Sequence, residues 1–254
     1  MIRGFLAAAF LAFIFIPSID AADNADHAEL LAKHYRLEKP NGAGPFPAVI
    51  LVSGGSGFDA DFAKAAYDDL QRRLVELGFV TLRVNYLAAR NVSAPTFVLP
   101  VSPEQVASDI CITVGYLRQQ PFVKKGAINV MGWSFGASAA LQALGRSHGR
   151  EPVQADAVVA YYPQCDFVQQ KWDSQVPVLV LVGSLDNIAP LRKCNWLFRG
   201  IPEDRLTIRE YDDAHHGFDC PGLPSETQYQ WGTHGYNETA ANSAWLEVTK
   251  FLRK

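Results

Sequence analysis

The sequence predicts an α/β fold in which helices cover both faces of a doubly wound, mainly parallel sheet. Strand and helix patterns alternate along the 254 residues, the apolar runs end at turn sequences, and 48% of the residues are hydrophobic. Such alternation is typical of a parallel sheet, because a crossover has to carry the chain back between neighbouring strands. We find no internal repeat and no linker that would divide the chain.

Short apolar runs define the expected strands. The first is FPAVILV at residues 46–52, which ends at the turn sequence SGGSG. Further strands are expected at residues 79–84, 127–131, 155–161, 176–182 and 205–211. Near-continuous apolar runs of this kind indicate strands that are buried on both faces.

Apolar residues at helical spacing separate these strands. They predict helices at residues 60–77, 135–144, 190–198 and 239–252. Another helix is expected from Ser102 to about Gln119. Ser102 is a good N-cap, Pro103 suits the first helical position, and Gln105 completes a capping box.

The N-terminus has the pattern of a secretory signal peptide. Arg3 precedes an apolar run at residues 5–16, and small or polar residues follow at 18–22. The run is shorter than the roughly 20 apolar residues of a membrane span. We expect residues 1–22 to be removed, leaving one domain at 23–254 without a stable membrane span, in a secreted or periplasmic protein. An uncleaved anchor or a first core helix are the alternatives.

Composition limits the partners of the chain. Its formal net charge is −3 and only 19% of the residues are charged, without a long run of either sign. The sequence has no cluster of lysine and arginine of the kind found in nucleic-acid-binding proteins, so we expect no nucleic-acid partner. The four cysteines show no CxxC spacing and no cluster with histidine, so no metal or organic cofactor is expected. The sequence indicates no oligomeric state.

The segment GWSFG at residues 132–136 carries the main chemical signal. It places Ser134 in a G-x-S-x-G pattern between an expected strand and an expected helix. A serine on such a strained turn projects above the carboxyl edge of the sheet, and the flanking Gly132 and Gly136 allow close backbone contact. Ser134 is therefore the candidate nucleophile. A glycine-lined turn with a capping serine is the alternative.

A serine nucleophile needs a base and an acid, which follow it along the chain in this fold. Three histidines beyond Ser134 lie in plausible positions for the base: His215, His216 and His234. The first two follow the last expected strand, and spacing alone does not separate them. Asp186 follows the strand at residues 176–182 and is the candidate acid, with Asp166 as the second candidate. Asp186 would fix the imidazole tautomer, unless it serves only to cap the next helix.

Backbone donors and pocket residues complete the expected site. The N–H of Phe135 and one N–H from the turn at residues 53–57 would form an oxyanion hole. Trp133 and Tyr86 are candidates for an apolar pocket, although aromatic residues beside such a turn are as often part of the core. Arg90 is a candidate to hold a substrate carboxylate, with a solvated loop arginine as the alternative.

Taken together, these residues resemble the dienelactone hydrolase family of α/β-hydrolases, in its secreted or periplasmic branch. The resemblance runs from about residue 47 to 252 and rests on PAVILVSGGSG, YLRQQPFVKKGAINVMGWSFGASAAL, AYYPQCDF, PVLVLVGSLDNIAP and AHHGFDCPGLP. It implies His216 as the base, supports Asp186, and implies Gly55 as the second oxyanion donor. The namesake enzymes use a cysteine nucleophile where this chain has Ser134, and an acidic residue where it has Gly54.

The resemblance also implies a disulfide between Cys165 and Cys194, while Cys111 and Cys220 either pair or stay reduced. The expected function is that of a serine hydrolase, a carboxylic ester hydrolase that cleaves small-molecule esters or lactones through an acyl-enzyme. A peptidase or thioesterase using the same three residues, and a non-catalytic binding protein of this fold, are the alternatives.

Overall fold

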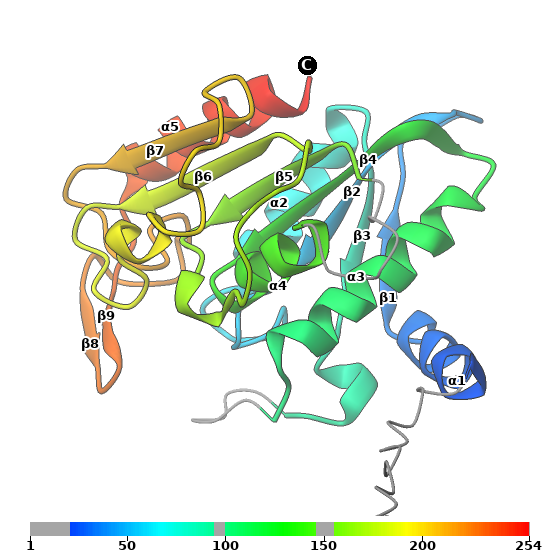
Figure 1. Cartoon of the computed structure of the whole chain (residues 1–254), viewed down its shortest axis with the longest axis horizontal. Coiled ribbons are helices and arrows are strands. Elements are labelled where there is room, and N and C mark those ends of the chain that lie inside the picture. The colour runs from blue at the N-terminus through cyan, green and yellow to red at the C-terminus, as the bar shows by residue number, and fades with distance from the viewer. Residues whose placement is uncertain (1–20, 94–99, 146–154, 254) are drawn as a thin grey trace, which may run out of the picture.

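The structure is a computed structural model that describes residues 21–93, 100–145 and 155–253 (Figure 1). Its centre is a seven-stranded sheet in the order β1-β3-β2-β4-β5-β6-β7, in which β1 pairs antiparallel with β3 and the other neighbours are parallel. The strands are β1 (Tyr35–Glu38), β2 (Phe46–Val52), β3 (Val80–Val84), β4 (Val123–Trp133), β5 (Ala157–Tyr161), β6 (Val178–Gly183) and β7 (Leu206–Tyr211). This arrangement confirms the predicted fold class.

Helices cover both faces of the sheet. The helices α3 (Pro103–Arg118) and α4 (Phe135–Leu144) pack on one face, and α2 (Lys64–Glu76) and α5 (Glu238–Leu252) pack on the other (Figure 1). β2 shows why both faces of the sheet have to be covered by helices. Ile50 points into the apolar core beneath α3 and α4, Leu51 points into the core beneath α2 and α5, and both side chains are fully buried. The predicted capping box of α3 is present, with Gln105 N–H donating to Ser102 Oγ.

Several elements differ from the expected pattern. The predicted helix at residues 190–198 is wrong: a single 3₁₀ turn, η3 (Leu191–Cys194), forms there. Its carbonyls accept from residues three positions on, and its last residue is joined by a disulfide to Cys165. α2 begins at Lys64 rather than at residue 60, because a separate turn occupies residues 60–63. The polar N-terminal segment forms α1 (Ala21–Ala32), and the edge strand β1 was not predicted.

A small hairpin of β8 (Thr227–Tyr229) and β9 (Gly232–His234) extends beyond the carboxyl edge of the sheet (Figure 1). The hairpin joins the rest of the molecule through a bridge between His216 and His234. It therefore flanks the edge at which the expected site lies.

Residues 1–20 lie outside the described residues, so the structure covers only positions 21 and 22 of the expected signal peptide. None of the described helices is long and apolar enough to cross a membrane. A disulfide joins Cys165 to Cys194, which is the pairing that the resemblance implied. Cys111 and Cys220 are both reduced.

Candidate active site

Ser134 lies on a sharp turn between β4 and α4. Its backbone has φ 49° and ψ −116°, a left-handed φ that a serine rarely adopts. The Ser134 N–H donates to the carbonyl of Tyr161 at 2.9 Å, which ties the turn to the neighbouring strand β5. The strained turn therefore holds the hydroxyl at the carboxyl edge of the sheet, as the G-x-S-x-G pattern predicts.

The two glycines of the pattern are sterically required. A Cβ on Gly132 would lie 2.6 Å from the carbonyl oxygen of Gly136, and a Cβ on Gly136 would lie 2.3 Å from that of Ser53. Both separations are below any real Cβ contact, and both neighbours are backbone atoms that have no freedom to move aside. The pattern is thus explained by backbone crossing in the turn.

A continuous chain of hydrogen bonds joins Ser134, His216 and Asp186. The Oγ of Ser134 lies 2.9 Å from Nε2 of His216, and Nδ1 of the same ring lies 2.8 Å from Oδ2 of Asp186. The three residues come from the ends of three different strands, β4, β6 and β7. Asp186 and His216 are both buried, so water competes little for these bonds.

Asp186 is held as an ionised acceptor. Its Oδ1 accepts the N–H groups of Ile188 at 2.9 Å and Ala189 at 2.7 Å. Burial by itself raises the pKa of this carboxyl, but the attraction of His216 and the three hydrogen bonds outweigh burial and lower it. The carboxylate therefore receives the Nδ1–H of His216 and directs the lone pair of Nε2 toward Ser134.

The remaining candidates lie elsewhere. Asp166 is half exposed and forms an ion pair with Lys193. His215 has a buried Nδ1 without a hydrogen-bond partner among the described residues, and Ser134 contacts His216 instead.

The expected oxyanion donors lie close to Ser134. Phe135 is the first residue of α4, where the N–H groups of the first turn have no partner within the helix. Gly55 lines the same pocket as Ser134, while the neighbouring Gly54 N–H is already bonded to the hydroxyl of Tyr67 at 3.3 Å. Gly55 is thus the donor of this turn that stays a candidate.

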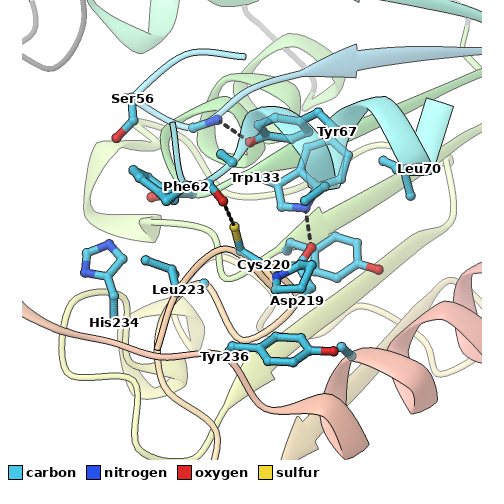
Figure 2. A pocket seen from close by; sticks show the side chains of 18 of the residues that line it. Ser56, Phe62, Tyr67, Leu70, Trp133, Asp219, Cys220, Leu223, His234 and Tyr236 are labelled. Carbon is cyan, nitrogen blue, oxygen red and sulfur yellow. Dashed lines mark hydrogen bonds between the residues drawn. The ribbon is translucent and has the colours of Figure 1, made fainter. Parts of the chain in front are cut away.

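A pocket of about 360 Å³ opens beside Ser134 and His216 and extends between α2 and α5 (Figure 2). This volume falls within the range of roughly 300–1,000 Å³ that is typical of small-molecule sites. Aromatic side chains dominate its wall: Phe62, Tyr67, Trp133, Tyr161, Tyr162, Tyr236 and Trp245. Trp133 therefore lies in the predicted place.

The predictions for Tyr86 and Arg90 as pocket residues are wrong. Tyr86 is fully buried below the turn and donates its hydroxyl to the carbonyl of Gly54 at 2.9 Å. Arg90 forms a two-bonded ion pair with the buried Asp109, at 2.5 and 2.9 Å, and Asp109 also contacts His27 of α1 at 2.7 Å. These long-range partners withdraw both side chains from the pocket.

Among the pocket residues that sequence reasoning did not assign to the pocket, Tyr162, Asp219 and His234 lie next to the expected site residues. Tyr162 has a φ of 37°, and its ring packs against the imidazole of His216 with centroids 4.4 Å apart. Asp219 accepts hydrogen bonds from Trp133 and Tyr162. His234 of the hairpin packs edge-on against His216 at 5.1 Å. The motif HGFD, which places Asp219 three residues after His216, was the one available signal for an acid at this position.

The described residues contain no group of three or more His, Cys, Asp or Glu side chains that is suited to hold a metal ion. Ser134, His216 and Asp186 form one hydrogen-bond chain at the edge of the pocket. Such a site can activate a hydroxyl for attack on an electrophilic carbonyl.

The strand order, the turn at Ser134 and the order of the three residues along the chain define an α/β-hydrolase. The chain belongs to the dienelactone hydrolase family, whose model matches residues 34–254. The family name refers to a lactone, which is a cyclic carboxylic ester.

Individual relatives agree with this assignment. Esterase EstD of Thermotoga maritima is 28% identical over 162 residues, a match that covers 60% of this chain and 35% of EstD, so it spans about a third of that relative. A structure described as a dienelactone hydrolase of Klebsiella pneumoniae has a TM-score of 0.68 at 20% identity, covering 87% of this chain and 92% of the other. Esterase 2 of Thermogutta terrifontis, phosphoramylated by tabun, has a TM-score of 0.60 at 15% identity, covering 85% and 86%.

Proposed function

We propose that this chain is a serine hydrolase that cleaves carboxylic esters or lactones of small molecules through an acyl-enzyme. The observation that carries the proposal is the hydrogen-bond chain from Ser134 Oγ through His216 to Asp186, at 2.9 and 2.8 Å. Membership of the dienelactone hydrolase family and the similarity to an esterase support it.

In the proposed reaction, Ser134 Oγ attacks the ester carbonyl while Nε2 of His216 takes the hydroxyl proton. The N–H groups of Phe135 and Gly55 stabilise the negative charge that develops on the carbonyl oxygen. His216 then gives the proton to the leaving alcohol, and an ester is left on Ser134. Water, deprotonated by the same imidazole, releases the acid and restores the serine.

Asp186 acts through His216 in this scheme. Its carboxylate holds the Nδ1–H tautomer and stabilises the imidazolium that forms when Ser134 loses its proton. Tyr162 packs against the same ring from the side and restricts its rotation.

The pocket supports a small-molecule substrate rather than a long peptide. Its volume of about 360 Å³ and its aromatic wall suit an acyl or alcohol group of modest size. Peptidase or thioesterase activity would use the same three residues, and a substrate panel of esters, thioesters and anilides separates the three.

We further propose that residues 23–254 act as one domain outside the cytoplasm after removal of residues 1–22. The disulfide between Cys165 and Cys194 supports an oxidising compartment. Mass measurement of the protein recovered from a secreting host tests this: an N-terminus near residue 22 or 23 is expected, and an intact N-terminus overturns it.

Covalent labelling tests the nucleophile. The mature protein is treated with a fluorophosphonate, and the adduct is mapped by mass spectrometry beside Ser134→Ala and Ser56→Ala. Ser56 lines the same pocket, so its variant controls for a general loss of reactivity. Label on Ser134 in the wild type and in Ser56→Ala, but not in Ser134→Ala, is expected. A folded wild-type protein that takes up no label overturns the proposed function.

A further inference from the structure

Asp219 is a carboxylate whose two hydrogen-bond partners are both neutral. Trp133 Nε1–H donates to Oδ2 at 2.7 Å, and the hydroxyl of Tyr162 donates to Oδ1 at 2.6 Å. In the described part of the chain, no lysine, arginine or histidine forms an ion pair with it. Burial raises the pKa of this carboxyl. The two side-chain hydrogen bonds, one from its own backbone N–H and the charge of His216 act in the opposite direction without outweighing burial.

The two bonds do not explain why this side chain is charged. An asparagine here would accept from Trp133 through its oxygen and donate to the Tyr162 oxygen through its amide. The packing of both rings would then be kept without the cost of partly desolvating a charge. A half-buried carboxylate without a cationic side-chain partner among the described residues therefore points to a partner from outside the chain.

Asp219 is reachable from the pocket. It lies in the wall of the pocket beside Ser134 and His216, near the middle of the labelled side chains in Figure 2, and keeps a partly exposed surface there. A carboxylate has about four acceptor positions, and the bonds from Trp133, Tyr162 and the backbone N–H of Asp219 leave at least one of them open. A ligand in the pocket can therefore bond directly to this carboxylate.

Among the described residues, the other ionisable groups of the pocket form no ion pair with this carboxylate. At the far end of the pocket, Nη1 of Arg73 lies 3.7 Å from Oδ2 of Asp69, and its Cζ lies 4.0 Å from the ring centroid of Trp245. The guanidinium therefore already has an anionic and an aromatic partner. Burial lowers the pKa of His234 to about 4, which leaves it neutral at pH 7. His216 is directed toward Asp186.

Aromatic side chains surround the carboxylate, among them Tyr67, Trp133 and Tyr162. Aromatic faces attract organic cations, and the attraction is stronger where water is excluded. An aromatic wall around an unpaired carboxylate is thus suited to an ammonium group.

We propose that Asp219 is a cation-binding group, and that the preferred ester substrates of this pocket carry an organic ammonium in their acyl or alcohol part. This assignment rests on the proposed ester hydrolysis at Ser134. An ammonium with an N–H donates to a free acceptor position of Asp219, and a quaternary ammonium is attracted by its charge alone. Either group packs against the aromatic wall while the ester carbonyl reaches Ser134.

Matched substrate pairs test the assignment. Ethyl 6-aminohexanoate is compared with ethyl heptanoate, and butyrylcholine with 3,3-dimethylbutyl butyrate, so that each pair differs in charge and little in size. For the wild type, kcat/KM is expected to be about 10- to 100-fold higher for at least one charged ester, as one charge-assisted hydrogen bond would give. The preference is expected to fall to about 3-fold or less in Asp219→Asn and to persist in Asp69→Asn.

Equal rates on charged and neutral esters in the wild type, or an unchanged preference in Asp219→Asn, overturn the assignment. If Asp219→Asn loses activity on every ester, binding of n-butylammonium and tetramethylammonium is measured by calorimetry on Ser134→Ala and on Ser134→Ala with Asp219→Asn. Binding that requires Asp219 supports the assignment, and binding that is absent from both proteins overturns it. A wild type that hydrolyses neither kind of ester but binds ammonium would instead refute the proposed function.

Discussion

The replacement Asp186→Asn tests whether the hydrogen bonds that join Asp186, His216 and Ser134 serve catalysis or only structure. The N–H groups of Ile188 and Ala189 both donate to Oδ1 of Asp186, at 2.9 and 2.7 Å. They would therefore hold the amide oxygen of asparagine in that place and turn its NH₂ toward Nδ1 of His216, 2.8 Å from Oδ2 in the wild type. Nδ1 then has to accept a hydrogen bond, so the ring proton moves to Nε2. His216 thus presents an N–H to Ser134 instead of the lone pair that would accept the hydroxyl proton.

The expected loss follows from this tautomer. The corresponding change in a serine protease lowers kcat by about 10⁴-fold, or about 5.5 kcal/mol at 1.36 kcal/mol per tenfold. We expect a similar loss of kcat on 4-nitrophenyl butyrate, with KM changed by less than about threefold, because Asp186 does not line the pocket.

The control is Asp166→Asn, which removes the other acid that follows a strand. It is half exposed and paired with Lys193, so activity should stay within about twofold. Circular dichroism and a melting curve show that both variants are folded. If a folded Asp186→Asn keeps more than a tenth of the wild-type kcat, or if Asp166→Asn shows the large loss instead, the role assigned to Asp186 is refuted.

Three further predictions concern the turn, the disulfide and a buried cation. Gly136→Ala places a Cβ 2.3 Å from the carbonyl oxygen of Ser53 and should abolish fluorophosphonate labelling. Gly115→Ala in α3, where a Cβ meets nothing within 4 Å, should keep the labelling. Labelling of a folded Gly136→Ala would contradict the steric argument. Replacing Cys165 and Cys194 together by serine should lower the free energy of unfolding by about 3–4 kcal/mol in urea titrations, given a sequence separation of 29, and a loss below about 1 kcal/mol would contradict it. Asp68→Asn leaves the buried Arg83 without its 2.8 Å partner and should cost about 1–2 kcal/mol at pH 7. The pKa of Asp68 is lowered to about 2, chiefly by the hydrogen bond from Lys64. The loss of stability in Asp68→Asn should therefore disappear as pH falls from about 4 toward 2, where the wild-type carboxylate becomes protonated. A loss that does not change with pH would exclude this ion pair as its cause.

The parts of the fold that sequence predicts well are those with one dominant local cause. β2 and α4 have the predicted bounds, residues 46–52 and 135–144. A strand buried on both faces has an unbroken apolar run, and the turn at Ser134 fixes where α4 begins. The short strands β1, β8 and β9 have three or four residues each, so they offer too few positions for alternation to be visible.

The helix predicted at residues 190–198 shows how tertiary structure overrides a local pattern. Its apolar spacing is compatible with a helix, but Cys194 is bonded to Cys165 and the N–H of Trp172 donates to the carbonyl of Leu197. These partners lie 29 and 25 positions away in the chain, beyond the range of any periodicity. The segment consequently forms a 3₁₀ turn and irregular backbone.

The candidate site divides in the same way. The ends of three strands are visible in the sequence, and each is followed by one site residue: Ser134, Asp186 or His216. Because these strands are parallel, their ends lie at the same edge of the sheet, and this brings the three residues together. Arg90 also lies in a loop after a strand, yet its partner Asp109 sits in the middle of α3, fully buried and bonded to His27 as well. The sequence gives no sign of that pairing, because an aspartate within a helix reads as a solvent-facing residue.

Two carboxylates near Ser134 show how the surroundings assign different tasks to one chemical group. Asp186 has an ionisable partner, His216, and two backbone donors, and these lower its pKa despite burial. Asp219 has two neutral donors, and burial raises its pKa. A carboxyl that stays charged across the working pH range is suited to orient an imidazole, since its bond must not change as His216 gains and loses a proton. A carboxyl without a cation gains most from a ligand that brings one, because the ligand removes the cost that burial imposes. The two pKa directions follow from the partners of each carboxyl. Those partners, the imidazole of His216 for Asp186 and two neutral ring donors beside an open pocket for Asp219, are the reason that we propose proton chemistry for Asp186 and substrate selection for Asp219.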